Sequence, residues 1–360
     1  ATGTLHTMVP REWIGASRFL VFARDTAGLL GDDPAEATRL PRFVRVTDLI
    51  RLPTTEIAAG GNSTIRQVLE DVPRHFLYLS QPELHRIARY SLTGRALATP
   101  ISLATAPSGI DLTLGGDSLL VALRDADALG VINLQSLTQV STVPLLFAPF
   151  DGGPDQIRVA ANDRALISIS ALPCCSGGRL MDLDLAAGTQ RVRTEVGIYS
   201  TISEIAPLIS GKARSPVIAF TGYGCPCTAQ LYDPNTDSFS TERPAGDFLW
   251  PPPTIDTSGT RVLVGPRLYD GAMAALQTLV PAGQYYWGTT ALSPDGQTAA
   301  FATDEGFLIQ RIADGVVLGR YRLPALPWQL QFIASERVLM AWGGYQYGSG
   351  TNRVFLVELP

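Results

Sequence analysis

The sequence predicts an all-β protein built from repeated four-stranded antiparallel units. Eight short apolar runs recur along the 360 residues at intervals of 37 to 57 positions. Gly, Pro, Asp and Asn bound these runs, and no segment longer than about ten residues keeps the 3.6-residue period of an amphipathic helix. A row of such meanders is typical of a β-propeller, in which the units are blades closed into a ring.

The apolar runs are predicted to be the second strand of each unit. They are nearly continuously apolar rather than alternating, so we expect them to be buried on both faces between packed sheets. The runs begin at Arg18, His75, Ser118, Arg164, Pro216, Arg261, Thr298 and Arg337.

Polar turns separate the strands within each unit. Ser293-Pro294-Asp295-Gly296 precedes one apolar run, and a second turn, Arg311 to Gly315, follows the third strand of the same unit. Pro and Gly there set the dihedral angles of tight hairpin turns. From Ser293 to Gly315 the chain resembles the WD40-like repeats of the TolB propeller family, and its strand–turn–strand rhythm is similar to YVTN-type propellers. This resemblance implies the fold alone, because propellers host many unrelated activities.

The number of blades depends on the N-terminal segment. We expect a single propeller domain over residues 1–360 with eight blades, or seven if the irregular segment 1–60 is not a full blade. The last unit, Trp328 to Leu359, has only three strands. We therefore expect an N-terminal strand near Gly3 to Val9 to complete it, since such closure removes the last free sheet edge.

Composition restricts the classes of partner. The formal net charge of −5 and the pI near 5.3 give no cationic field for DNA or RNA, so no nucleic-acid partner is expected. No apolar run approaches the roughly 20 residues that cross a bilayer. We expect no transmembrane segment in this chain.

The four cysteines form two tight pairs, Cys174-Cys175 and Cys225-Pro226-Cys227. Both pairs fall in the loop after the second strand of neighbouring units, and an even count favours disulfides in the periplasm or outside the cell. Bridges between the loops and bridges within each pair are both open, the latter including a vicinal bond. A four-thiolate metal site and free thiols are the alternatives, but structural zinc usually uses Cys-x2–4-Cys spacing. We therefore predict no metal.

Catalytic signals are weak. The three histidines, His6, His75 and His85, are scattered over the first two units, and neither His75 nor His85 has a nearby nucleophile motif such as G-x-S-x-G. A vicinal cysteine pair on an eight-bladed ring resembles the quinoprotein alcohol dehydrogenases, but the Trp docking motif of that family is missing from the corresponding turns. We predict no catalytic residue and no cofactor.

Aromatic residues give the clearest functional signal. Trp250, Trp287 and Trp328 lie 10 to 12 residues before the aligned position of the second strand in successive units, which places them at one mouth of the ring. A glycine-rich loop after the last apolar run adds more rings to this face, a composition typical of adaptable recognition loops. The alternative is that these rings pack between blades. The predicted aromatic face consists of Tyr285, Tyr286, Trp287, Trp328, Trp342, Tyr345 and Tyr347.

The functional prediction follows from this face. We expect a non-catalytic secreted or periplasmic propeller that binds another protein, or acts as an accessory or scaffold subunit of a larger complex. The alternatives are an enzyme with a site in the central channel, lactonase-like or quinone-dependent, and a carbohydrate-binding propeller that uses the same rings.

Overall fold

The computed structural model divides the chain into two units, Ala1–Ile50 and Arg51–Pro360. In the first unit, β1 (Phe19–Leu20) pairs with β2 (Phe43–Val44), and β3 (Leu49–Ile50) follows. Membership of both units in one domain stays a prediction. The described residues are 19–20, 43–44, 49–50, 52–57, 64–146, 151–171, 178–196, 208–221, 227–246, 253–279, 289–303, 306–323, 327, 329–334, 338–342 and 354–359.

The second unit is a propeller of antiparallel sheets, named blades 1 to 7 in chain order. Blade 1 contains β5 (Val68–Asp71), β6 (Phe76–Gln81), β7 (Arg86–Ser91) and β8 (Ala96–Ser102). Blade 2 contains β9 (Pro107–Leu112), β10 (Ser118–Leu123), β11 (Ala128–Asn133) and β12 (Thr138–Pro144). Blade 3 contains β13 (Asp151–Val159), β14 (Arg164–Ala171), β15 (Arg179–Asp184) and β16 (Gln190–Val192).

The remaining blades repeat this order. Blade 4 contains β17 (Leu208–Ser210), β18 (Val217–Thr221), β19 (Cys227–Asp233), β20 (Ser238–Phe239) and β21 (Arg243–Gly246). Blade 5 contains β22 (Thr254–Ile255), β23 (Arg261–Val264), β24 (Arg267–Asp270) and β25 (Ala275–Thr278). Blade 6 contains β26 (Thr290–Leu292), β27 (Thr298–Thr303), β28 (Gly306–Arg311) and β29 (Val317–Arg322). Blade 7 contains β30 (Gln329–Ile333), β31 (Val338–Trp342), β32 (Val354–Glu358) and β4 (Thr54–Ile57).

Each blade buries both of its faces, as the continuously apolar second strands predict. In β6, Tyr78 packs into the cluster shared with blade 2, whereas its neighbours Leu77 and Leu79 pack into the cluster shared with blade 7. Successive side chains of a strand point to opposite faces, so one strand supplies two inter-blade contacts. Each fully buried leucine there contributes roughly 1.5–3 kcal/mol.

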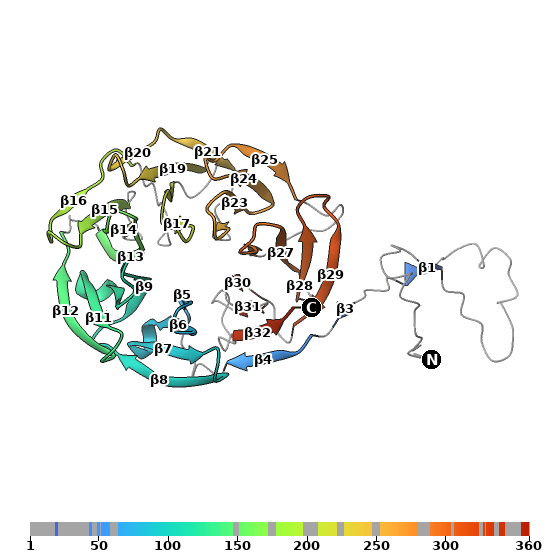
Figure 1. Ribbon diagram of the computed structural model, residues 1–360, viewed down its shortest axis with the longest axis horizontal. Coiled ribbons are helices and arrows are strands. Elements are labelled where there is room, and N and C mark those ends of the chain that lie inside the picture. The colour runs from blue at the N-terminus through green and yellow to red at the C-terminus, as the bar shows by residue number, and fades with distance from the viewer. Residues whose placement is uncertain are drawn as a thin grey trace, which may run out of the picture. The chain divides into compact units, whose positions relative to one another are not determined.

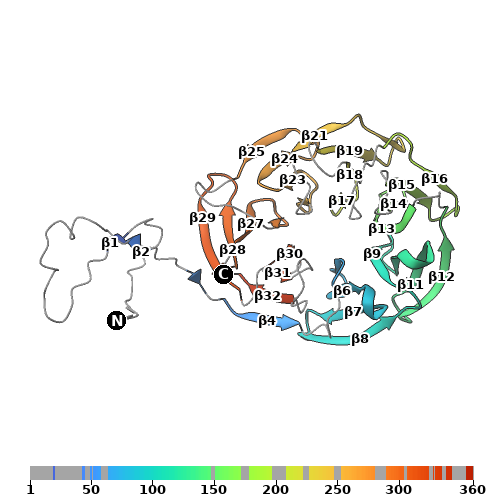
Figure 2. The same ribbon diagram turned by 180° about the vertical axis from the view of Figure 1, so that it is seen from behind.

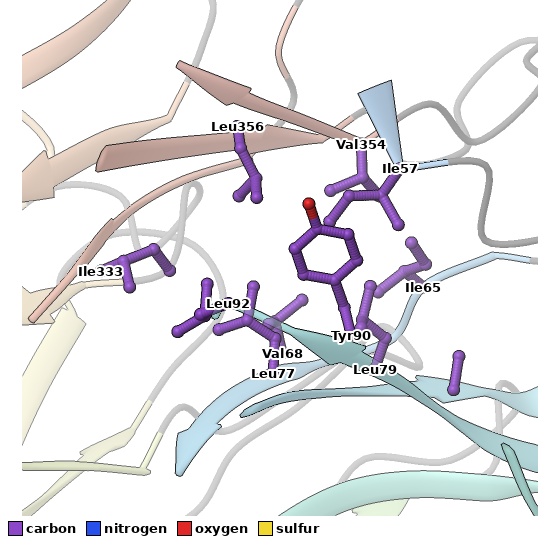
Figure 3. Packing of buried hydrophobic residues seen from close by; sticks show 11 residues of the cluster. Ile57, Ile65, Val68, Leu77, Leu79, Tyr90, Leu92, Ile333, Val354 and Leu356 are labelled. Atoms are coloured by element: carbon purple, nitrogen blue, oxygen red, sulfur yellow. The ribbon is translucent and has the colours of Figure 1, made fainter. Parts of the chain in front are cut away.

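The blades form a closed ring. Seven hydrophobic clusters each join two successive blades, and one of them joins blade 7 back to blade 1. In that closing cluster, Tyr90 and Leu79 of blade 1 meet Val354, Leu356 and Ile57 of blade 7 (Figure 3). The first strands of the blades lie toward the centre of the ring and the last strands at its perimeter, as Figure 1 and the reverse view in Figure 2 show.

Two details of the ring differ from the sequence prediction. The described residues form seven blades, the alternative to the eight expected, because the run that begins at Arg18 contributes β1, which belongs to the first unit and pairs there with β2. The closing strand is β4, whose residues Thr54 and Ile57 pair with Val357 and Val354 of β32. Closure by an upstream strand is confirmed, but the strand directly before blade 1 provides it. Residues 3–9 lie outside the described part.

Helical structure is minor. The described elements include no α-helix, only the single-turn 3-10 helices η2 (Pro82–Leu84) and η3 (Arg124–Ala126), each after the second strand of its blade. In the described part of the chain, no helix has the length and apolar character needed to span a membrane.

Candidate functional site

The predicted aromatic face falls mostly on residues outside the described part of the chain. This applies to Tyr285, Tyr286, Trp287, Trp328, Tyr345 and Tyr347. Trp342 is the last residue of β31, and the register of its backbone places it opposite Gln329 on one side and Val354 on the other. The contacts of all seven side chains stay a prediction.

The cysteine pairs also fall mostly outside the described part of the chain. Cys174, Cys175 and Cys225 lie outside the described residues, and Cys227 is the first residue of β19, opposite Gly246. No disulfide is present among the residues that the structure describes. His75 and His85 both occupy turns with a left-handed backbone, at φ of 55° and 46°. Within the described ranges, no three His, Cys, Asp or Glu side chains are grouped so that they could hold a metal ion.

The structure describes in detail a polar inner edge of the ring, where side chains join successive first strands. Gln67 Oε1 accepts a hydrogen bond from the backbone N–H of Ile110 at 3.0 Å, and Gln156 Oε1 accepts one from Leu208 at 3.0 Å. Thr254 Oγ1 does the same for Leu292 at 3.0 Å. The first strand of a blade has an unpaired edge toward the centre, so these acceptors satisfy N–H groups that the sheet leaves open.

Asp155 of β13 joins three blades at this inner edge. Its side chain is 1% exposed, and its Oδ1 accepts from Arg66 Nη2 at 2.9 Å and from Ser108 Oγ at 2.7 Å. The second oxygen, Oδ2, has no hydrogen-bond partner in the described part of the chain. Blades 2 and 3 approach closely here, since a Cβ added to Gly109 would lie 2.4 Å from the Asp155 carbonyl oxygen. Only glycine fits at position 109.

Further along β13, the carboxylate of Asp111 lies near two arginines but pairs with only one of them. Asp111 Oδ2 accepts from the Val159 N–H at 2.8 Å and from Arg214 Nη1 at 3.1 Å. Arg158 donates through Nη1 to the Ile157 carbonyl at 2.7 Å and forms no ion pair with a described carboxylate. Burial lowers the pKa of Arg158, Asp111 raises it and Arg214 lowers it again. The group, here called the inner-edge arginine pair (Arg158 and Arg214), carries an excess positive charge.

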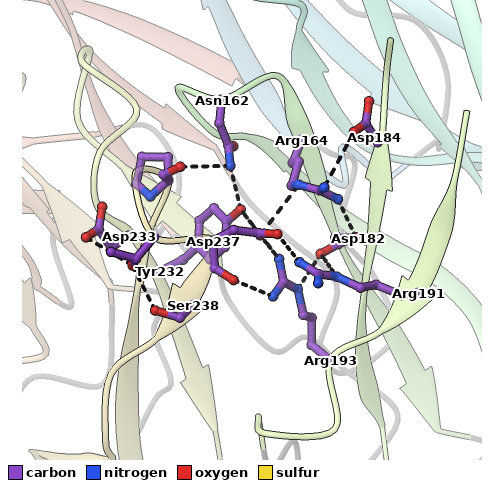
Figure 4. Close-up of polar contacts among 12 residues, drawn as sticks. Asn162, Arg164, Asp182, Asp184, Arg191, Arg193, Tyr232, Asp233, Asp237 and Ser238 are labelled. Atoms are coloured by element: carbon purple, nitrogen blue, oxygen red, sulfur yellow. Dashed lines mark hydrogen bonds and ion pairs between the residues drawn. The ribbon is translucent and has the colours of Figure 1, made fainter. Parts of the chain in front are cut away.

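A second charged cluster, made of arginine and carboxylate side chains, joins blades 3 and 4 (Figure 4). Three arginines lie there among three aspartates. The fully buried Asp182 accepts hydrogen bonds from Arg164 at 3.2 Å and from Arg191 at 2.9 Å, and it also forms an ion pair with Arg193. Asp237 of blade 4 accepts from Tyr232 at 2.6 Å and from both Arg191 and Arg193. Arg193 also pairs with Glu195 at 3.2 Å, so four carboxylates face three arginines in this cluster and no arginine lacks a counter-charge. We therefore interpret it as an inter-blade connection rather than a binding site.

The electrostatics of Asp237 reflect that role. Burial alone would raise the pKa of the Asp237 carboxyl, but the hydrogen bonds from Tyr232, Arg193 and Arg191 outweigh it and lower the pKa from 3.8 to about 2. Burial and the bond that it donates to Asp237 raise the pKa of Tyr232 to about 12. Around neutral pH, the Asp237 carboxyl is therefore ionised and the Tyr232 phenol is protonated.

Sequence reasoning missed the polar inner edge. A signal was present, because Gln156 and Arg158 alternate with apolar residues in a strand whose neighbours are fully buried, and Asp111 interrupts an apolar run. Such polar residues in a first strand indicate side chains that reach the next blade. The partner of each one depends on the ring geometry, which the sequence does not contain.

Comparisons with known proteins identify the fold. No protein-family model matches the chain, and no curated protein matches it by sequence. Among solved structures, the β-propeller domain of Myceliophteria thermophila Cps50 (Swd1) is similar with a TM-score of 0.63 and 13% identity, covering 86% of this chain and 100% of that one. This chain is a β-propeller. Kuenenia stuttgartiensis hydrazine synthase is also similar, with a TM-score of 0.61 and 10% identity over 78% of this chain and 93% of that one. At these identities the likenesses concern the propeller fold alone.

Proposed function

We propose that this propeller is a non-catalytic, exported protein that binds another protein through the aromatic face defined above. It would act as a scaffold or as an accessory subunit of a larger complex. The proposal rests on the backbone arrangement of blades 6 and 7. In these blades, the strand ends that adjoin three of the aromatic positions lie close to one another.

Two described contacts support this arrangement. Gln329, which follows Trp328 in the chain, lies opposite Trp342 in the pairing of β30 with β31. Thr289, two residues after Trp287, accepts a hydrogen bond at its Oγ1 from the N–H of Leu330 at 3.4 Å. The described residues Thr289, Gln329 and Leu330 therefore lie close together in the ring, which supports the proposal of a continuous aromatic surface.

The carboxylates of the described blades favour binding over acid–base catalysis. Asp111, Asp155, Asp182 and Asp237 each accept hydrogen bonds from arginine side chains. For Asp237 the hydrogen bonds from Tyr232, Arg193 and Arg191 lower the pKa, whereas a general acid needs a raised pKa. These four groups hold blades together and leave the loops free to carry the contact surface, as in other ring and repeat proteins.

The test compares binding by the unaltered chain with binding by Trp342→Ala and Tyr345→Ala variants. A partner captured from native extract, identified by mass spectrometry and purified, is titrated against each chain by calorimetry. Buried interface aromatics usually contribute about 1 kcal/mol or more, so each variant is expected to bind at least about fivefold more weakly.

The matched control removes exposed apolar surface elsewhere. Leu276 lies on the outer strand β25 and is 53% exposed, so Leu276→Ala is expected to bind as tightly as the unaltered chain. Equal losses in all three variants would contradict the aromatic face. A Trp342→Ala chain that unfolds would instead assign that ring to the core, where truncation of a large aromatic costs about 3–5 kcal/mol.

A further inference from the structure

The inner-edge arginine pair differs from the other arginine clusters of the ring in its charge balance. In the cluster between blades 3 and 4, the three arginines Arg164, Arg191 and Arg193 face four carboxylates, those of Asp182, Asp184, Glu195 and Asp237. At the inner edge, Arg158 and Arg214 have only Asp111 between them. One guanidinium therefore lacks a carboxylate counterpart among the described residues.

Asp111 has little capacity left for a second arginine. Its Oδ1 accepts the N–H of Leu112 at 2.9 Å, and its Oδ2 accepts both the Val159 N–H at 2.8 Å and Arg214 at 3.1 Å. Arg158 instead donates to the carbonyl of the residue before it. The Asp111 carboxylate therefore accepts from the backbone of blade 3 and from the hairpin of blade 4, and it forms no ion pair with Arg158.

Both arginines keep donors that the described protein does not use. Arg158 and Arg214 each engage described acceptors through Nη1 alone, Arg214 bonding the Val159 carbonyl at 3.1 Å as well as Asp111. A guanidinium carries five N–H donors in a planar fork that fits two oxygens of one oxyanion. Both residues are partly exposed, Arg214 at 19% of its side chain.

We propose that the inner-edge arginine pair is a binding site for a small oxyanion, a carboxylate or a phosphate. The ion would accept from the unused guanidinium nitrogens of Arg158 and Arg214 and would supply the negative charge that Asp111 does not. Arg158 belongs to blade 3 and Arg214 to the β17–β18 hairpin of blade 4, so the bound ion would also join these two blades. This site is independent of the aromatic face.

The test uses inorganic phosphate and glutarate as probes of the two oxyanion classes, with chloride at matched ionic strength as the reference. A ligand that binds the folded state raises the unfolding temperature with a saturable concentration dependence. We expect phosphate or glutarate, but not chloride, to produce such a rise in the unaltered chain. Calorimetric titration with the same probe gives the dissociation constant directly, and the probe that saturates at lower concentration identifies the class of the natural ion.

Three variants decide the assignment. Arg158→Gln is expected to lose the saturable rise and to weaken calorimetric binding at least tenfold, whereas Arg158→Lys, which keeps the charge, is expected to retain part of both. Arg311→Gln is the control, because Arg311 pairs with Asp314 in an exposed turn of blade 6 and is expected to bind like the unaltered chain. The site is refuted if neither probe differs from chloride, or if Arg158→Gln binds as well as the unaltered chain. If Arg158→Gln fails to fold, Arg214→Gln replaces it as the variant that removes a charge. Arg158→Lys remains the variant that keeps the charge.

Discussion

Arg193, which directly follows the last strand of blade 3, forms an ion pair with Asp237 of blade 4 while its guanidinium lies 5.1 Å from the centre of the Tyr232 ring. The same guanidinium also pairs with the fully buried Asp182. A single side chain thus connects two blades by charge and by stacking, and its side chain is only 3% exposed.

Replacing Arg193 by methionine is expected to destabilise the ring strongly. The fully buried Asp182 loses one of its three arginine partners and keeps Arg164 and Arg191, so the expected cost is at most the roughly 3–5 kcal/mol of a buried charge left with no partner. Urea unfolding followed by circular dichroism measures the loss. Arg311→Met, which breaks the exposed pair with Asp314, is the control and is expected to leave the unfolding midpoint unchanged. A similar effect in both variants would mean that the cluster between blades 3 and 4 adds nothing beyond surface charge.

The lowered pKa of Asp237 predicts a specific pH dependence. Because the pKa is 3.8 before folding and about 2 in the ring, the stabilisation by the ionised carboxylate is complete above the unfolded value and is lost as the pH falls toward 2. The free energy of unfolding of Asp237→Asn should therefore lie below that of the unaltered chain at pH 5, and the gap should close on acidification. A gap that stays constant down to about pH 2 would exclude the carboxylate as its source.

Ile57 tests ring closure by β4. Its side chain is 2% exposed and belongs to the cluster that joins blade 7 to blade 1, so Ile57→Ala is expected to cost about 2–5 kcal/mol. Leu97→Ala removes a comparable aliphatic side chain from the outer strand of blade 1, where Leu97 is 43% exposed, and should change stability by less than about 0.5 kcal/mol. Thermal unfolding of the two variants makes the comparison. An Ile57→Ala chain as stable as Leu97→Ala would show that β4 is dispensable.

The cysteines are expected to be oxidised. Mass spectrometry of protein that is unfolded and alkylated without reduction should find no label on Cys174, Cys175, Cys225 or Cys227, because an even number of paired cysteines in neighbouring loops favours disulfides. Reduction before alkylation is the control and should label all four. Four labelled thiols in the unreduced sample would remove the argument for an oxidising compartment.

The sequence predicted the fold well and the charged contacts poorly, for a physical reason. Runs such as Phe76–Gln81 are apolar without alternation because both of their faces are buried, and that property is local to each strand. The blade count failed at the N-terminus, where the run at Arg18 has the same composition but lies in a different unit. Val159 and Arg214, which donate to Asp111, lie 48 and 103 residues away in the chain, and Asp237, which pairs with Arg193, lies 44 residues away. No local pattern could indicate these partners.

The pairing of β4 with β32 also determines when the ring can close during synthesis of the chain. Ile57 lies opposite Val354, which is 297 positions later in the sequence, so β4 is made long before its partner. At translation rates of about 5–20 residues per second, β4 waits roughly 15–60 s before it can pair. Six blades can assemble as they emerge, but the circle cannot be completed on a partly made chain. A chain that terminated before β32 would therefore be an open ring, in which β4 and β31 present unpaired strand edges.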